Sequence, residues 1–119
     1  MPRTVQLTTH RGWWVFSPVL AALQPFKTYG ALRGDVMDGY LPSTGRLPSA
    51  WVQRLRKEQP DYVVFFYDTP IAWHSEKDGW TKPPVKYSVR TAQHQLRIFT
   101  AIDNPNGLSL TRELREQGR

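Results

Sequence analysis

The sequence has no cysteine among its 119 residues. This absence excludes disulfide bonds, thiolate zinc ligands and a cysteine nucleophile. It is compatible with a reducing compartment, and it means that the hydrophobic core alone must hold the fold.

Long apolar runs are missing as well. Runs such as residues 19–23 are far shorter than the roughly 20 residues that a membrane-spanning helix needs. The sequence also lacks the charged start and apolar run of a signal peptide. We therefore expect a cytoplasmic protein that does not associate with a membrane.

Motifs of catalysis are scarce. The sequence contains no glycine-rich phosphate loop, no dinucleotide fingerprint and no Gly-x-Ser-x-Gly nucleophile elbow. Its three histidines, His10, His74 and His94, lie far apart and lack the i, i+4 spacing of a helical metal site. We predict a non-catalytic protein without cofactor or metal, in which a structural role for His94 is favoured over an acid–base role.

Apolar and basic residues are plentiful. Hydrophobic residues make up 39% of the chain and aromatic residues 13%, which is enough to predict a folded protein. Lys and Arg number 16 against 10 Asp and Glu, which gives a formal net charge of +6. Such an excess favours polyanionic partners. The basic residues are scattered along the chain, so a role in solubility is the competing interpretation.

The strongest strand signal is the apolar run of residues 61–67, DYVVFFY, which predicts a central strand covered on both faces. Pro70 cannot donate a hydrogen bond to a sheet, so we expect a bulge or bend there before residues 71–73 continue the strand. The turn sequence Lys-Asp-Gly at residues 77–79 predicts an antiparallel return at Trp80.

The first third of the chain predicts further strands. Alternation over residues 5–9, a break at residues 10–12 and an apolar group at residues 13–16 indicate a hairpin. Residues 26–32 predict another strand, and residues 34–47, rich in glycine, predict a surface loop.

Two main helices are predicted, one after Ser49 and one over residues 92–102 with Thr91 as its cap. The residues expected to face inward are Trp51, Val52 and Leu55 in the first helix and Leu96, Phe99 and Ile102 in the second.

These elements predict an α+β fold with a small, largely antiparallel sheet of three to five strands packed by two main helices. We expect a single domain over residues 1–119, with residues 108–119 as a loosely docked or frayed tail. The predicted core consists of Trp51, Leu55, Val63, Val64, Phe65, Phe66, Leu96 and Phe99.

One part of the chain carries a recognisable pattern. Residues 67–73 read YDTPIAW, and residues 85–95 read VKYSVRTAQHQ. The two stretches resemble a Tyr-x-Thr-Pro-Ile-Ala-Trp stretch and a following Tyr-Ser-x-Thr-Thr-x-x-His-Gln stretch of small uncharacterised proteins of actinobacterial phages. The resemblance covers about a third of the chain, and Arg90 stands where the pattern has threonine. It implies a phage source, hence the cytoplasm of an infected bacterial host, and it implies no mechanism.

Aromatic residues beside arginines are the first candidates for binding a polyanion, because an exposed ring can stack on a base while the cation meets a phosphate. Arg11, Trp13 and Trp14 have this arrangement. Consecutive strand residues point to opposite faces, so one of the two rings is expected to project from the hairpin. The alternative, that the rest of the chain covers both rings, stays open.

A cationic face is the second candidate, built from Arg54, Arg56 and Lys57 of the first helix and Arg90 and Arg97 of the second. These five charges would follow a phosphate backbone if both helices lie on the same side of the sheet. The same exposed residues would also suit a protein that binds a host bacterial protein and modulates or inhibits it, because Trp and Arg dominate binding energy at protein interfaces. We predict a macromolecular partner, nucleic acid ahead of a host protein.

Overall fold

The computed structural model describes residues 3–8, 12–38 and 40–105 of the chain. Within them, six strands form one sheet in which the spatial order follows the sequence. The strands are β1 (Val5–Leu7), β2 (Phe26–Thr28), β3 (Leu32–Val36), β4 (Tyr62–Phe66), β5 (Thr69–Ser75) and β6 (Gly79–Thr81). β1 and β2 are parallel, and every other neighbouring pair is antiparallel. The expected α+β class and the largely antiparallel sheet are confirmed, with more strands than predicted.

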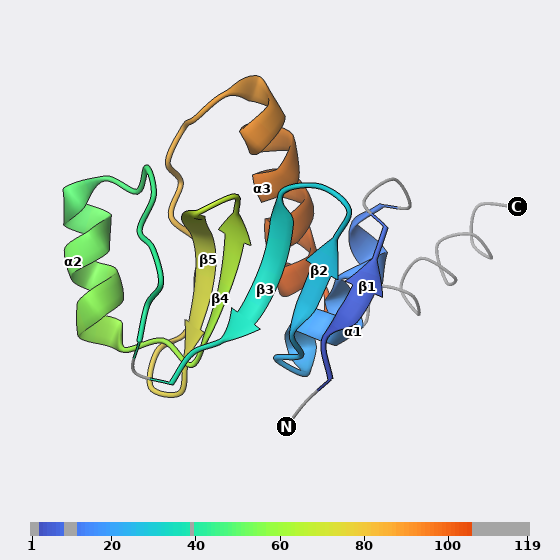
Figure 1. Cartoon of the computed structure of the whole chain (residues 1–119), viewed down its shortest axis with the longest axis horizontal. Coiled ribbons are helices and arrows are strands. Elements are labelled where there is room, and N and C mark those ends of the chain that lie inside the picture. The colour runs from blue at the N-terminus through green and yellow to red at the C-terminus, as the bar shows by residue number, and fades with distance from the viewer. Residues whose placement is uncertain (1–2, 9–11, 39, 106–119) are drawn as a thin grey trace, which may run out of the picture.

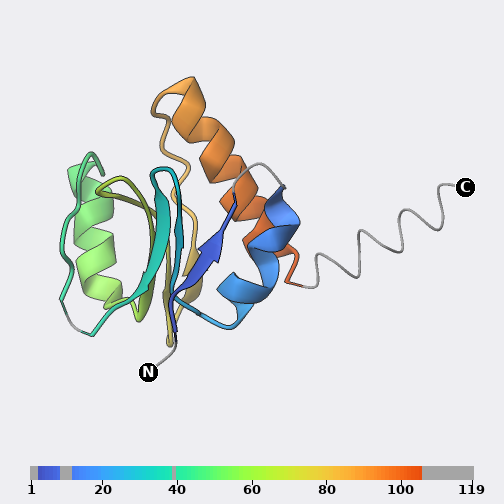
Figure 2. The same ribbon diagram turned by 45° about the vertical axis from the view of Figure 1, so that its right-hand side comes forward.

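Helices cover both faces of the sheet (Figures 1 and 2). They are the 3-10 helix η2 (Trp13–Val15) and the α-helices α1 (Ser17–Ala21), α2 (Ser49–Glu58) and α3 (Val89–Asp103). α2 lies on one face, and η2, α1 and α3 lie on the other. Because successive strand residues point to opposite faces, β4 serves two cores. Tyr62 and Val64 pack with residues of α1 and α3, whereas Val63 and Phe65 pack with α2.

A buried carboxylate fixes α2 to the sheet. Glu58, the last residue of α2, has a side chain that is only 8% exposed. It accepts hydrogen bonds from the indole N–H of Trp73 at 2.6 Å, the hydroxyl of Thr81 at 3.0 Å and the guanidinium of Arg54 at 2.9 Å. Burial alone would raise the pKa of Glu58, but these hydrogen bonds and the charge of Arg54 lower the pKa below its ordinary value. The ionised carboxylate therefore ties α2 to β5 and β6.

The apolar run of residues 61–67 forms the predicted central strand, β4, which has neighbours on both sides. The bulge expected at Pro70 is present as a register shift in the β4–β5 pairing. The chain then departs from prediction, because Tyr67 adopts a positive φ of 56° and the chain reverses into the antiparallel strand β5. The prediction that residues 71–73 continue the same strand was wrong, since an apolar pattern does not reveal a positive φ. The antiparallel return at Trp80 is confirmed.

The hairpin predicted over residues 5–16 is not formed. β1 pairs in parallel with β2, and Trp13 begins η2, which leads into α1. Parallel neighbours need a connection that crosses one face of the sheet, and η2 with α1 provides it. Phe16 and Leu20 of this connection are fully buried, in the same core as Ile98 of α3. The apolar group therefore reaches the core from helices instead of a strand.

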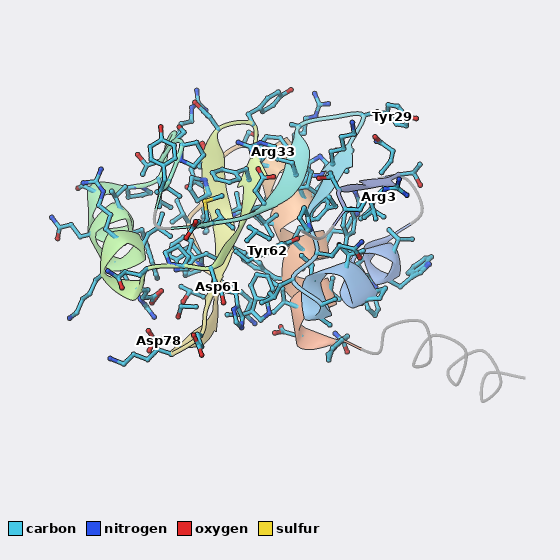
Figure 3. All side chains as sticks on the ribbon, turned by 60° about the horizontal axis from the view of Figure 1, so that its bottom comes forward. Arg3, Tyr29, Arg33, Asp61, Tyr62 and Asp78 are labelled. Atoms are coloured by element: carbon cyan, nitrogen blue, oxygen red, sulfur yellow. The ribbon has the colours of Figure 1, made fainter. Side chains whose placement is uncertain are left out.

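The strand predicted over residues 26–32 is divided by a turn into β2 and β3. β3 also extends into residues 34–47, which were predicted as a loop. Gly34 explains the difference, because a Cβ at this position would lie 2.4 Å from both the Phe26 ring and the Tyr62 hydroxyl. The glycine therefore serves close packing within a strand. Figure 3 shows Tyr62 in the interior, where its hydroxyl donates to the carbonyl of Gln24 at 2.7 Å.

Helix α3 begins earlier than predicted, and its buried face is rotated. Ser88 is the cap in place of Thr91, because the Ser88 hydroxyl accepts the N–H of Thr91 at 3.2 Å. Leu96, predicted to be core, is 68% exposed, and that prediction was wrong. Gln95 is buried instead, and its amide donates to the carbonyl of Val85 at 3.0 Å. A pattern of apolar residues gives no sign that a glutamine is buried, so the buried face predicted for this helix was displaced by about one residue.

The other predicted core residues do lie at the core. Those that are fully buried are Leu55, Val63, Val64 and Phe65, and those that are half-buried against it are Trp51, Phe66 and Phe99.

Candidate functional site

The cations predicted to form one face lie on two. Arg54, Arg56 and Lys57 belong to α2, and Arg90 and Arg97 belong to α3. Because α2 and α3 cover opposite faces of the sheet, the condition for a five-charge face is not met (Figure 2). The charge around α2 is also mixed, since Arg54 pairs with Glu58 and the adjoining surface carries Glu76 and Asp78.

The two tryptophans do not form an exposed stacking surface. Trp13 and Trp14 belong to η2, both are half-buried, and their rings meet edge to face with centroids 6.2 Å apart. Trp13 packs against the core shared by α1 and α3. The expectation that one ring projects assumed the alternation of a strand, whereas both residues lie in a 3-10 helix and both are half-buried. Arg11 lies outside the described residues.

Other residues meet at the end of the sheet where α3 begins. The β2–β3 turn, the β4–β5 turn and the first turn of α3 all lie at this end (Figure 1). The two strand turns touch, since the N–H of Tyr67 donates to the carbonyl of Ala31 at 2.8 Å. Tyr29 is 88% exposed and Tyr67 is 63% exposed, and Figure 3 shows Tyr29 on the outside of its turn. We call this surface the rim, and it consists of Tyr29, Arg46, Tyr67, Tyr87 and Arg90.

The rim contains a pocket of about 430 Å³. The turn after β4, the first turn of α3 and the loop before α2 contribute its walls. The lining residues are Arg46, Phe66, Tyr67, Asp68, Thr69, Tyr87, Ser88, Arg90 and Thr91. A pocket of this size falls within the range of small-ligand sites.

The loop before α2 is tied to the pocket by its backbone. The N–H of Arg46 donates to the hydroxyl of Thr69 at 2.9 Å. Gly45 has a positive φ of 46°, and a Cβ there would lie 2.3 Å from the same hydroxyl. Only glycine fits so close to Thr69 in this conformation. The contact brings Arg46 to the pocket that Arg90, at the start of α3, also lines.

Both pocket arginines are free of acidic partners within the described part of the chain, where the ion pairs involve neither Arg46 nor Arg90. The first turn of α3 contains no acidic residue. The N–H groups of a first helical turn lack partners within the helix and carry partial positive charge. Among the described residues that line the pocket, Asp68 is the one carboxylate beside two arginines, so these residues together carry a net positive charge.

Tyr67 is the most unusual residue of the rim. Its φ of 56° lies in the left-handed region, which costs a bulky L-residue free energy and which glycine or asparagine adopts more easily. The ring rests edge-on against Phe66, with centroids 5.0 Å apart, and most of its surface remains exposed. A strained backbone that presents an aromatic side chain to solvent is typical of a functional position.

Unsatisfied polar groups lie behind the pocket. His94 packs against Phe66 with ring centroids 5.0 Å apart. Its Nδ1 and the hydroxyl of Tyr87 are buried without a hydrogen-bond partner among the described residues. Burial, Arg97 and Arg90 lower the pKa of His94, so this imidazole is neutral near pH 7. A neutral, shielded ring fits a structural role.

Sequence reasoning identified one rim residue, Arg90, and missed the other four. Arg46 and Tyr29 belong to turns and loops whose meeting depends on tertiary structure. The available signal was the pair of stretches YDTPIAW and VKYSVRTAQHQ, on which the resemblance noted above depends. Tyr67 and Thr69 from its first stretch and Tyr87 from its second all line the pocket, so the two stretches meet there.

A second hollow, of about 460 Å³, lies beside the C-terminal half of α2. It contains two carboxylates, Asp38 and Asp61, and one cation, Arg56, together with the 74% exposed ring of Tyr40. Its net negative charge makes it less suited to a polyanion than the rim pocket.

Comparisons with known proteins identify no relative of this chain from which a function of the site could be inferred. No protein-family model, no curated protein and no solved structure matches the chain. Within the described ranges, no helix combines the length and apolar character of a membrane span. The same residues contain no cluster of three or more His, Asp or Glu side chains that could hold a metal ion.

Proposed function

We propose that this protein is a non-catalytic phage-type accessory protein that binds single-stranded nucleic acid at the rim, in the cytoplasm of an infected bacterial host. One observation carries the proposal: the exposed, strained ring of Tyr67 lies at a pocket with two arginines that lack acidic partners among the described residues. Stacking on an aromatic ring and pairing of phosphate with arginine are the two contacts by which single strands are held.

The geometry favours an unpaired strand over a duplex. Tyr67 and Tyr29 project from adjacent turns, so that both rings are accessible from outside. A ring at the tip of a turn can stack only on a base that has left its own helix. Stacking contributes about 1–3 kcal/mol per base. Substitution Tyr67→Ala is therefore expected to weaken binding roughly tenfold.

The test is a titration of labelled single- and double-stranded DNA at about 50 and 200 mM salt, the range over which phosphate contacts show their dependence. Two phosphate contacts predict a log–log salt slope near −1.4 for a single strand, which corresponds to about sevenfold weaker binding at the higher salt. The double variant Arg46→Ala/Arg90→Ala is expected to abolish most of this salt dependence.

Arg56→Ala/Lys57→Ala is the matched control. It likewise removes two positive charges, from exposed positions in the last turn of α2, at the end of the sheet away from the rim (Figure 1). We expect its affinity to remain close to that of the wild type. Equal weakening by both double variants would show diffuse electrostatic attraction, and no binding of either DNA at 50 mM salt would refute the proposal.

A host bacterial protein is the second candidate partner, and a separate observation supports it. Helix α3 presents an outward stripe of Val89 and Leu96, which are 79% and 68% exposed, with Arg90 and Arg97 beside it. Exposed apolar residues flanked by arginines are typical of protein interfaces. If the protein binds a host protein through α3, Leu96→Ser should abolish capture of that protein. If it binds nucleic acid at the rim, Leu96→Ser should leave the affinity for DNA unchanged.

A further inference from the structure

The rim pocket has more hydrogen-bond donors than a phosphate inside a nucleic-acid strand has free oxygens to accept them. Arg46 and Arg90 each carry a guanidinium with five N–H groups, and they reach the pocket from two separate segments. A phosphodiester inside a strand offers two free oxygens and one negative charge. A phosphate at the end of a strand is a monoester, which has three free oxygens and close to two negative charges at pH 7.

Helix α3, whose first turn forms part of the pocket wall, adds to the preference for a terminal phosphate but is not its main cause. The first turn of α3 carries Arg90 and no acidic residue, and the Ser88 hydroxyl is already occupied by the N–H of Thr91. An anion near such a helix start is stabilised by the partial charge of the N–H groups. Asp68 offsets one of the two arginine charges. A doubly charged group gains more from the remaining positive potential than a singly charged one.

The pocket is also larger than a phosphate. Its volume of about 430 Å³ leaves room for the sugar of the last nucleotide. The exposed ring of Tyr67 is one of its lining residues, in a position to stack on the base of that nucleotide. The pocket thus offers arginines to the phosphate, space to the sugar and the Tyr67 ring to the base of the same nucleotide.

We infer that the rim pocket holds the terminal phosphate of a nucleic-acid strand, so that the protein recognises strand ends. The inference rests on the proposed function, because it assigns one end of the bound strand to the pocket. Both 5′- and 3′-phosphates carry the required monoester chemistry.

The test compares three internally labelled oligonucleotides of one sequence that carry a 5′-phosphate, a 3′-phosphate or hydroxyls at both ends. At about 150 mM salt, we expect one phosphorylated strand to bind roughly tenfold more tightly than the hydroxyl strand, as a charge-assisted arginine contact would give. Arg90→Gln is expected to remove this difference. Arg97→Gln, on the same helix but not among the lining residues, is expected to retain it. Unchanged melting temperatures would show that both variants are folded.

The outcomes separate this inference from the proposed function. Equal affinity of the wild type for all three strands would refute end recognition and leave nucleic-acid binding intact. No binding of any strand would refute the proposed function. A preference that survives both Arg90→Gln and Arg46→Gln would place the end elsewhere and overturn the assignment. A free mononucleotide that competes as well as the phosphorylated strand would assign the pocket to nucleotides instead.

Discussion

Replacement of Glu58 by alanine is expected to be among the more destabilising single changes in this protein. Trp73 is fully buried and Thr81 is 7% exposed, so Glu58→Ala leaves an indole N–H and a hydroxyl without their acceptor in the core. An unsatisfied buried donor costs about 1–3 kcal/mol, and hydrogen bonds to charged groups contribute about 1.5–3 kcal/mol. The ion pair with the 56% exposed Arg54 adds only about 0.3–0.5 kcal/mol.

These contributions overlap, and together they predict a loss of about 3 kcal/mol in the free energy of unfolding. For a chain of 119 residues this corresponds to a fall of about 12 °C in melting temperature. Glu58→Gln keeps the shape and one acceptor, so about half that loss is expected. Chemical denaturation and calorimetry measure both values, and Trp73 provides a near-ultraviolet circular dichroism signal for the packing of α2.

Acid provides a second measurement of the same carboxylate. Hydrogen bonds hold the pKa of Glu58 below its ordinary value of 4.5 in the folded state. Its contribution to stability is therefore present above pH 4.5 and is lost as the pH falls below that value. Glu58→Gln should reduce this acid-dependent loss.

The control for this series is Glu76→Ala, which removes an exposed carboxylate near α2 and should change the unfolding free energy by less than about 0.5 kcal/mol. A cost below about 1 kcal/mol for Glu58→Ala would refute the conclusion that this carboxylate holds α2 on the sheet.

Three further predictions concern α3 and the rim. Tyr67→Asn, which suits a φ of 56°, should preserve or raise stability by up to about 1 kcal/mol while it weakens DNA binding, as denaturation and titration of the same sample would show. Because burial, Arg97 and Arg90 lower the pKa of His94, the folded state resists its protonation, and stability should fall as the pH drops below 6.5. His94→Gln should flatten that fall, and an unchanged profile would contradict the assignment. Ile98→Ala should cost about 2–5 kcal/mol and Leu96→Ala less than about 0.5 kcal/mol, and equal costs would show that the buried face of α3 is misassigned.

Much of the fold could be predicted where one local signal dominates. The doubly covered strand of residues 61–67 needs no knowledge of its neighbours, because both faces are apolar. The return at Trp80 follows from its Lys-Asp-Gly turn in the same way. Prediction failed where a polar residue or a glycine is buried because of contacts with residues that are distant in the sequence or on another element. Gln95 is inside because it meets the carbonyl of Val85, and Gly34 lies in a strand because two aromatic side chains pack against it.

The candidate site was harder to predict than the fold, because its parts come from turns. A positive φ at Tyr67 and the contact of Gly45 with Thr69 leave no periodic signal in the sequence. Arg90 was identified by its place on a helix. Arg97 and the cations of α2 were expected to lie beside Arg90, but Arg46 lies there instead. The face of the sheet on which a helix packs depends on the whole topology, so the sequence did not reveal this neighbour.

The division of the basic residues between two faces has a consequence for how binding should respond to salt. A protein that used its positive charge as one continuous surface would form six or more phosphate contacts, and its salt slope on a single strand would be near −4. The rim offers two arginines at one pocket, while Arg56 and Lys57 lie in the last turn of α2, at the other end of the sheet. A shallow slope together with a large effect of Tyr67→Ala would therefore identify a short, aromatic-centred contact. A steep slope with little effect of Tyr67→Ala would instead show that the strand wraps around the molecule and contacts basic residues far from the rim.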